Sequence, residues 1–255
     1  MAAKTVKSLK KGLEILEAFS NYGSSLSLQE IAQATGLPKP TAYRFLQTFL
    51  SLNYIHYFST TRTYRLGPRV MALGLSVLSA MDLGTVAQPY LEELSRRIDQ
   101  NVNLGILDGC DVVYIIRIKR RKILEIDLSV GSRLSACGTA IGHAILAFSA
   151  KEKVERIIKN LSQDPVIAEK MGPDWKTFKQ KLAKIRQDGY SLNDEDYVKG
   201  LRSVGVPIFK ENGEVEGAVN VPVFSQLCTT ETLINDYLPL VKKTAETLSE
   251  LRGRV

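Results

Sequence analysis

Apolar residues recur at helical spacing through the first 50 positions of the chain. A first helix is expected between Ser8 and Ser20, with the inward positions Leu9, Leu13, Leu16 and Phe19. A second helix begins at a capping box formed by Ser27 and Glu30 and ends near Gly36. Pro40 suits the first turn of a third helix, so only a tight turn separates the second helix from the third.

The third helix has two chemically different faces. Its apolar positions follow the spacing i, i+3, i+4, i+7 and i+8: Ala42, Phe45, Leu46, Phe49 and Leu50. The opposite face carries side chains that donate to phosphates or base edges: Thr41, Tyr43, Arg44, Gln47 and Thr48. Because a helix fits the DNA major groove, this face suits recognition of DNA. A solvated polar face on a small bundle fits the same pattern, and the helix alone does not separate the two interpretations.

Two short aromatic runs follow the third helix. The runs at 54–58 and 63–66 flank a polar turn and predict a β-hairpin. Three helices followed by such a hairpin are typical of a winged helix-turn-helix fold. Arg62 is expected at the tip of the hairpin, where it can contact the phosphate backbone or the minor groove.

Positive charge is concentrated in this helical head. The first 70 residues contain nine Lys and Arg against three acids, whereas the remaining residues contain 25 against 24. A polyanion such as double-stranded DNA is therefore the expected partner of the head. No stretch approaches the roughly 18 apolar residues of a membrane span, and no apolar run follows the first lysines, so we expect a cytoplasmic protein with no membrane partner.

The hydrophobic period changes after residue 67. Pro68 can open a linker helix, expected through Met81, whose apolar stripe needs a partner. A helix from Asp82 to Asp99 follows, and β-rich runs are expected at 102–107, 112–118, 123–128, 204–209 and 215–223. Further helices are expected at 140–148, 151–160, 176–188 and 231–251. A largely antiparallel sheet with flanking helices predicts an α+β domain.

A loop of small residues at 131–142 leads into one of these helices. Unpaired amides at a helix N-terminus attract a carboxylate or another anion, so the loop is a candidate ligand site. Close packing of the helix on the sheet explains the small residues without any ligand. The loop alone favours the second explanation.

The sequence contains few residue patterns that are typical of a catalytic or metal-binding site. Cys110, Cys137 and Cys228 have neither the spacing of a disulfide framework nor that of a zinc site, and we expect no metal and no cofactor. Cys137 as a nucleophile and His143 as its base are the best catalytic candidates, but no third group that would orient the base is recognisable. We therefore predict no enzyme. The alternatives are a cysteine-dependent hydrolase-like enzyme and an interaction scaffold whose basic head binds an acidic protein rather than DNA.

Three motifs resemble the IclR family of bacterial transcriptional regulators over nearly the whole chain. They lie at 8–17, 36–46 and 64–67, and Pro40 departs from the Ser that is usual at its position in the family. The resemblance implies a winged helix-turn-helix domain at 1–67, a linker helix at 68–81 and a GAF-like mixed α/β effector-binding domain at 82–255. It also implies a homodimer or a dimer of dimers, whose paired heads reach a palindromic or repeated operator.

The third helix and the hairpin turn supply the candidate DNA-binding residues, and the resemblance supplies the candidate effector-binding residues. The DNA-binding residues are expected to be Lys39, Thr41, Tyr43, Arg44, Gln47, Thr48 and Arg62. The effector-binding residues are expected to be Ile123, Ile126, Leu134, Thr139, Ala140, Ile141, Asn193, Leu201, Ser203 and Asn220.

Several of these positions differ from the family pattern. Asn193 stands where the family commonly has an acid, and Ser203, Asn220 and Pro222 depart from the Cys and Ser of glyoxylate-responsive relatives. A different effector is therefore expected. Apolar walls with a few amides and hydroxyls suit a small carboxylic acid with an apolar body. Residues 128–146 are similar to the branch that controls aromatic-acid catabolism, so an aromatic body is one candidate.

Overall fold

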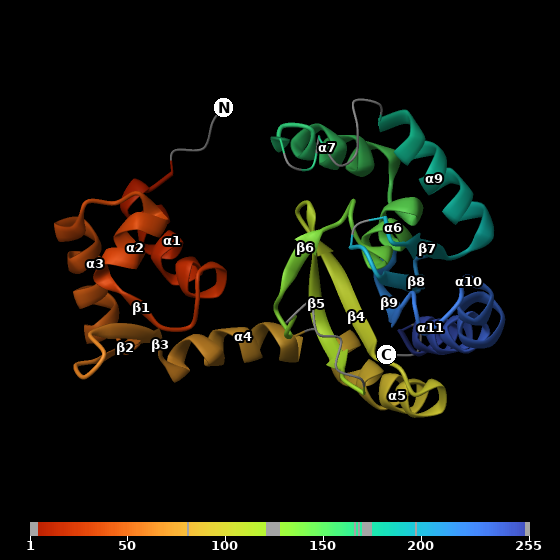
Figure 1. Ribbon diagram of the computed structural model, residues 1–255, viewed down its shortest axis with the longest axis horizontal. Coiled ribbons are helices and arrows are strands. Elements are labelled where there is room, and N and C mark those ends of the chain that lie inside the picture. The colour runs from red at the N-terminus through yellow and green to blue at the C-terminus, as the bar shows by residue number, and fades with distance from the viewer. Residues whose placement is uncertain are drawn as a thin grey trace. The chain divides into compact units, whose positions relative to one another are not determined.

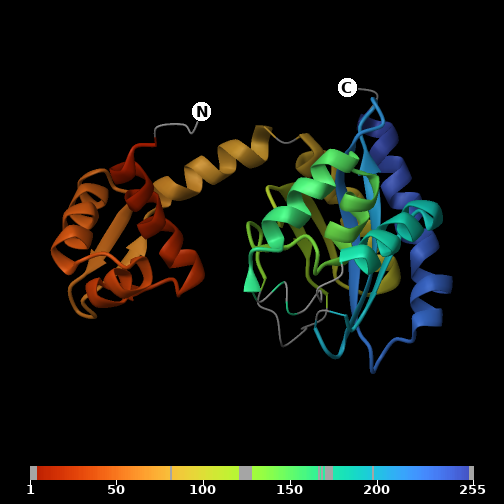
Figure 2. The ribbon, with the colours of Figure 1, turned by 90° about the horizontal axis from the view of Figure 1, so that it is seen from above.

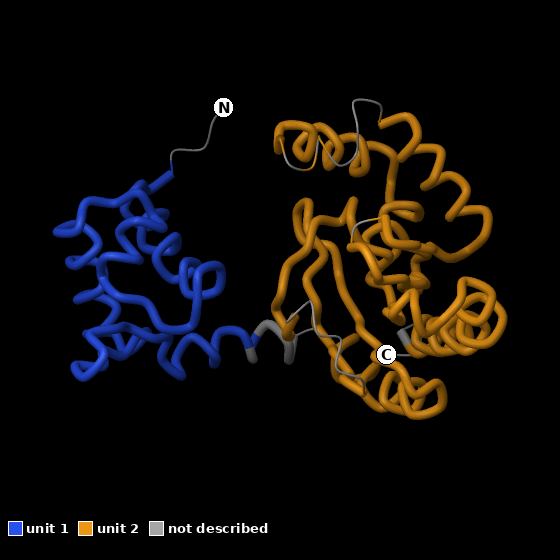
Figure 3. Tube along the Cα trace, in the orientation of Figure 1, with its two compact units in different colours: residues 1–80 blue, residues 81–255 orange. Residues whose placement is uncertain are grey.

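The chain forms two compact units, residues 1–80 and residues 81–255 (Figure 3). The computed structural model describes residues 5–80, 82–120, 128–165, 167, 169, 175–196 and 198–252. The described part of unit 1 contains three helices, a small three-stranded sheet and a fourth helix that follows the sheet. Unit 2 is built on a six-stranded sheet.

Local signals fix most of unit 1. Its elements are α1 (Lys7–Asn21), β1 (Leu26–Ser27), α2 (Leu28–Thr35), α3 (Lys39–Ser51), β2 (Ile55–Phe58), β3 (Thr63–Leu66) and α4 (Pro68–Ala80) (Figure 1). Both bonds of the Ser27 and Glu30 capping box are present, and Gly36 ends α2 in the left-handed region at φ 65°. The predicted hairpin forms, and β1 adds a third strand beside β3 that was not predicted.

The inward face of α1 differs from the prediction. Gly12, Ile15, Ala18 and Phe19 are buried in the core of unit 1, whereas Leu9 is 63% exposed and Leu13 is 50% exposed. Gly12 lies inward because it lets the rings of Phe45 and Phe49 approach the helix closely. A second, smaller correction concerns α3: Lys39 was expected as the cap before Pro40, but the helix begins at Lys39 with Pro38 as its cap and makes no side-chain cap bond.

Unit 2 contains groups of strands separated by groups of helices. Its elements are α5 (Asp82–Ile98), β4 (Val102–Asp108), β5 (Asp111–Ile118), β6 (Arg133–Ser135), α6 (Ala140–Phe148), α7 (Lys151–Leu161), α9 (Trp175–Asp188), β7 (Ser191–Asp194), β8 (Leu201–Phe209), β9 (Val215–Phe224), α10 (Thr230–Thr232), the π-helical turn η1 (Leu233–Tyr237) and α11 (Leu238–Arg252). The sheet is antiparallel in the order β6-β5-β4-β9-β8-β7.

Helices cover both faces of this sheet. Helix α6 packs on one face against β4, β8 and β9, and α9 packs on α6. Helices α5 and α11 pack on each other and cover the opposite face (Figure 1 and Figure 2). The arrangement is the α+β architecture expected from the sequence.

Three features of unit 2 depart from the expected elements. Strands β6 and β7 were not predicted, because each is only three or four residues long and lies at an edge of the sheet. The helix expected at 231–251 is divided, since α10, the π-helical turn and α11 follow one another. The run expected at 123–128 lies outside the described residues except for Leu128.

We expect Gly142→Ala to destabilise unit 2 by about 3 kcal/mol, because overpacking against an immovable backbone cannot relax. A Cβ atom at this position would lie 2.0 Å from the carbonyl oxygen of Ala136. Denaturant unfolding can be followed by the fluorescence of Trp175, the single tryptophan of the chain, which lies in unit 2.

The matched control is Gly84→Ala in α5, where no atom lies within 4 Å of the added Cβ. That change should be neutral or should stabilise the helix by up to about 1 kcal/mol. Equal unfolding midpoints for the two variants would contradict the close approach of α6 to residue 136.

Candidate functional site

Helix α3 presents a polar face from a firmly packed base. Ala42 and Leu46 are fully buried among α1 and α2, and Phe45 is half-buried. All the residues predicted for DNA binding on this helix are exposed except Thr41, which is half-buried: Lys39, Tyr43, Arg44, Gln47 and Thr48. The helix therefore exposes cationic, amide, hydroxyl and aromatic side chains along one side.

The hairpin of unit 1 exposes its turn. Arg62 is exposed and has a φ of 54°, in the left-handed region that a non-glycine residue adopts in tight turns. The hydroxyls of Thr61 and Thr63 lie 2.7 Å apart across this turn. Arg65 lies 4.6 Å from the centre of the Phe58 ring, which stiffens the strands behind the turn.

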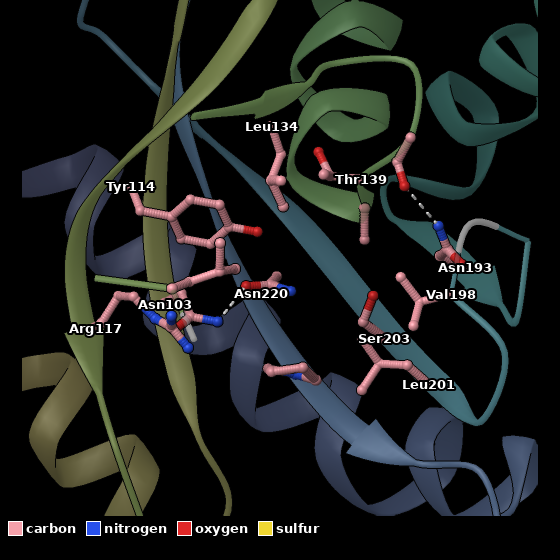
Figure 4. Close-up of a pocket in the computed structure, with 14 residues that line it drawn as sticks. Asn103, Tyr114, Arg117, Leu134, Thr139, Asn193, Val198, Leu201, Ser203 and Asn220 are labelled. Atoms are coloured by element: carbon pink, nitrogen blue, oxygen red, sulfur yellow. Dashed lines mark hydrogen bonds between the residues drawn. The ribbon is translucent and has the colours of Figure 1, made fainter. Parts of the chain in front are cut away.

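A pocket opens on the α6 side of the sheet in unit 2. It lies between the start of α6 and the sheet, and each of the six strands contributes at least one lining residue (Figure 4). The lining residues are Asn103, Tyr114, Arg117, Leu128, Leu134, Gly138, Thr139, Ala140, Asn193, Val198, Leu201, Ser203, Asn220 and Pro222. The space between them, including its opening to solvent, is about 630 Å³, a typical size for a small-molecule site of roughly 300–1,000 Å³.

The sheet holds the N-terminus of α6 at this pocket. The Thr139 hydroxyl caps the helix by accepting from the amide of Gly142 at 3.0 Å. The Ser191 hydroxyl on β7 donates to the Ala140 carbonyl at 2.6 Å, and Gly205 on β8 allows the same carbonyl to approach the strand. The first turn of α6 thus brings its positive dipole end to the pocket, where an anion is favoured.

The small residues at 131–142 are used in two ways: some allow close packing of α6, and others line the pocket. Gly142 is required by packing, because its backbone lies against Ala136. Gly138, by contrast, lines the pocket. Different residues of this segment therefore serve the packing of α6 and the wall of the pocket.

A β-bulge aims two unpredicted side chains into the pocket. The pairing of β4 with β5 shifts between Leu104 and Gly105, so that Asn103 faces Arg117 while Gly105 faces Tyr114. In a regular strand, residues 114 and 117 would point to opposite faces; the bulge places both on the pocket face. Burial raises the pKa of Tyr114 to about 12, so its phenol stays neutral. The alternation read from the sequence carries no signal for this bulge.

Amides orient the guanidinium at one end of the pocket. Arg117 Nε donates to Asn103 Oδ1 at 3.0 Å, and Asn103 Nδ2 donates to Asn220 Oδ1 at 2.9 Å (Figure 4). Asn103 and Asn220 are direct partners across β4 and β9 and are both buried. Among the described residues that line the pocket, Arg117 is the one that carries a charge.

The structure brings most of the predicted effector residues together. Those that line the pocket are Leu134, Thr139, Ala140, Asn193, Leu201, Ser203 and Asn220. Ile141 does not line it but is fully buried, with its side chain against Gly105. Ile123 and Ile126 lie outside the described residues.

Asn193 uses its amide to support the pocket wall. Its Nδ2 donates to the Gly138 carbonyl at 3.1 Å, and its Oδ1 accepts from the Asp196 amide at 3.2 Å. The side chain thus ties β7 to the loop that precedes α6. Ser203 differs, because its buried hydroxyl faces the pocket without a hydrogen bond to any other described residue.

Comparisons with known proteins agree with this architecture. Residues 8–57 match a family model described as the IclR helix-turn-helix domain, and residues 75–250 match one described as bacterial transcriptional regulator IclR C-terminal. The Pca regulon regulatory protein of Pseudomonas putida is 31% identical over 235 residues, which are 92% of this chain and 80% of that protein.

Two further relatives cover nearly the whole chain. The p-hydroxybenzoate hydroxylase transcriptional activator of Acinetobacter baylyi is 29% identical over an alignment of 260 positions, which covers 96% of this chain and 92% of that protein. A solved transcriptional regulator from Rhodococcus sp. RHA1 has a TM-score of 0.80 and 31% identity, over 96% of this chain and 98% of its own. These relatives are regulators and not enzymes.

The catalytic candidates do not form a nucleophile and base pair. His143 Nε2 lies 2.7 Å from the backbone oxygen of Cys137 rather than from its thiol. Burial raises the pKa of the Cys137 thiol to about 12 and lowers the pKa of His143 to about 4, so both side chains stay neutral at pH 7. Within the described ranges, no group of three or more His, Cys, Asp or Glu could hold a metal, and no helix is long and apolar enough to cross a membrane.

The buried neutral His143 predicts a loss of stability in acid. An unfolded histidine takes up a proton below about pH 6.5, whereas folded His143 resists protonation until about pH 4. The free energy of unfolding should therefore be unaffected by His143 above pH 6.5 and should fall by up to about 1.4 kcal/mol per pH unit between pH 6.5 and pH 4.

His143→Gln keeps a donor for the Cys137 carbonyl and removes the titration. Denaturant unfolding of both proteins, followed by Trp175 fluorescence across this pH range, should show a flatter curve for the variant. Parallel curves would mean that His143 is not held neutral.

Proposed function

This chain belongs to the IclR family of bacterial transcriptional regulators, and we propose how its two units bind DNA and an effector. It is a ligand-responsive regulator and not an enzyme. We propose that residues 1–67 bind duplex DNA, that 68–81 form a linker helix, and that residues 82–255 bind a small carboxylic acid with an apolar, aromatic body. Its site of action would be the cytoplasm, where bacterial DNA lies.

The exposed face of α3 supports the DNA-binding part of the proposal. Arg44 and Gln47 can form paired hydrogen bonds with base edges in the major groove, and Tyr43, 47% exposed, can contact a base or the sugar-phosphate backbone. Lys39 lies at the start of the helix, and its Nζ donates to Gln29 Oε1 at 3.3 Å. Arg62 on the hairpin would contact the neighbouring backbone or minor groove.

One observation carries the effector part of the proposal: positively charged groups and apolar side chains line the same pocket. Its described lining contains Arg117 and the N-terminal end of α6, and it contains no acid. Asn193 stands where the family commonly has an acidic residue, and an amide at this place adds no negative charge to the pocket. Leu134, Leu201 and Pro222 supply the apolar surface for the body of the ligand.

The described relatives point in the same direction. One is named as the regulator of the Pca regulon and another as the activator of p-hydroxybenzoate hydroxylase. We therefore propose control of a catabolic operon and use 4-hydroxybenzoate as the first probe of the pocket.

Exposed apolar side chains support assembly into a dimer. Val6, Leu9 and Leu13 follow one flank of α1, and Met71 and Leu73 are exposed on α4. Water contact of such a stripe is unfavourable, and a second copy can cover it. A dimer, or a dimer of dimers, would then offer paired α3 helices to a palindromic or repeated operator.

We expect Arg44→Ala to weaken operator binding by roughly 10- to 100-fold, because a lost paired contact to a base costs about 1–3 kcal/mol. The operator is a duplex selected from a random-sequence pool by the unchanged protein, and binding is measured by fluorescence anisotropy. Arg156→Ala on the exposed surface of α7 makes the same charge change and should leave affinity unaltered. Equal affinity of the Arg44 variant and the unchanged protein would remove α3 from the interface.

Ser203→Ala should lower affinity for 4-hydroxybenzoate about tenfold without changing the melting temperature, because its hydroxyl bonds no described protein group. Asn193→Ala should lower both quantities, since it also removes two hydrogen bonds that support the pocket wall. Calorimetric titration of the full chain measures affinity, with 4-hydroxybenzyl alcohol as the uncharged control ligand. Binding of the acid that neither variant alters would place its site elsewhere.

A further inference from the structure

A groove in unit 1 lies between the first turns of α1 and the exposed side of α3. Lys7, Ser8 and Lys11 line it from α1, and Thr41, Arg44 and Thr48 line it from α3. Phe45 is the apolar residue of its lining. The three lining residues from α1 are not among those expected to bind DNA.

Helix periodicity separates the lysines of α1 into two kinds. Lys7 and Lys11 are one turn apart and both face α3, whereas Lys10 points away and pairs with Glu14 at 3.8 Å. On the other flank of the helix, Leu9 and Leu13 are exposed. Helix α1 therefore has a cationic flank towards α3, a paired charged surface and an apolar flank.

The charges in this groove are not neutralised within unit 1. Lys7, Lys11 and Arg44 have no ion pair with another described residue. Like charges one helical turn apart cost a few tenths of a kcal/mol in an isolated helix, so Lys7 and Lys11 are unfavourable neighbours unless an anion lies between them and Arg44. An anion with several acceptor oxygens would satisfy all three cations at once.

We infer that this groove holds a phosphate of the DNA backbone at the edge of the major groove that α3 enters. The inference rests on the proposed placement of α3, because Arg44 and Thr48 belong both to the groove and to the recognition face. A phosphate is the anion that DNA presents beside every base edge, and flexible lysines on a neighbouring helix are suited to it. Contacts from Lys7 and Lys11 carry no base information and instead fix the register of α3.

The test compares single lysine changes that are equal in charge. Lys7→Ala, Lys11→Ala and Lys10→Ala are assayed as full-length proteins with two probes, a duplex selected by the unchanged protein and an unselected random-sequence duplex, over a range of potassium chloride concentrations. Counterion release makes the logarithm of affinity fall with the logarithm of salt concentration by about 0.9 for each phosphate neutralised. Because the two lysines share one phosphate with Arg44, Lys7→Ala and Lys11→Ala should each reduce this slope by up to about 0.9 per head, and each should weaken binding to both duplexes by the same factor.

The control variants decide the inference. Lys10→Ala should keep the slope of the unchanged protein, and Lys11→Arg should also have that slope, because it keeps the charge that Lys11→Ala removes. Slopes for Lys7→Ala and Lys11→Ala that equal the Lys10→Ala slope would overturn the inference while leaving DNA binding by α3 intact. If the unchanged protein prefers no selected duplex over the random one, it is the proposed function that fails. Thermal unfolding should be the same for all variants, because all three lysines are exposed.

Discussion

The close approach of α6 to the sheet is the constraint on which the pocket depends. Side chains at 142 or 205 would collide with backbone, since a Cβ at Gly205 would lie 2.6 Å from the Ala140 carbonyl oxygen. Because both positions are glycine, α6 lies close enough to the sheet for Ser191 to donate to that carbonyl. The helix therefore begins at the edge of the cavity. A strong positive dipole end is thereby fixed in place before any ligand arrives, so binding does not have to pay for ordering it.

The head was largely predictable because its signals are local. Ser27, Glu30 and Gly36 act through bonds within one or two turns, and the structure contains them as expected. The inward face of α1 was not predictable in the same way. Leucines at helical spacing show that a helix has an apolar side, but not whether this chain or another covers it. Gly12 does not count as apolar in such a pattern, although its missing side chain is what admits Phe45 and Phe49.

The pocket was predictable only in part, for a related reason. Thr139, Ser203 and Asn220 followed from resemblance to a family, and the structure gathers them around one cavity. Tyr114 and Arg117 were missed because a single extra residue in β5 reverses the alternation, and a bulge leaves no mark in the hydrophobic period. Short edge strands such as β7 have too few residues to give a recognisable hydrophobic pattern. Asn193 could therefore be assigned to the site, but its hydrogen bonds to the pocket wall could not be predicted.

The packing of α5 gives the effector a way to act beyond its pocket. An effector changes DNA affinity only if it binds two arrangements of the protein with different affinity. Helix α5 packs on β4 and β5, the strands that carry Asn103, Tyr114 and Arg117, and a single residue separates it in sequence from α4. A ligand whose carboxylate bound Arg117, as proposed above, would act on the bulged segment of β5, where the register of the ladder is interrupted. Because β5 lies against α5, a shift of β5 on binding would reach the helix that precedes the sheet and follows α4 in sequence. The bulge that directs Arg117 into the pocket therefore lies in the strand through which the proposed effector would act on α5.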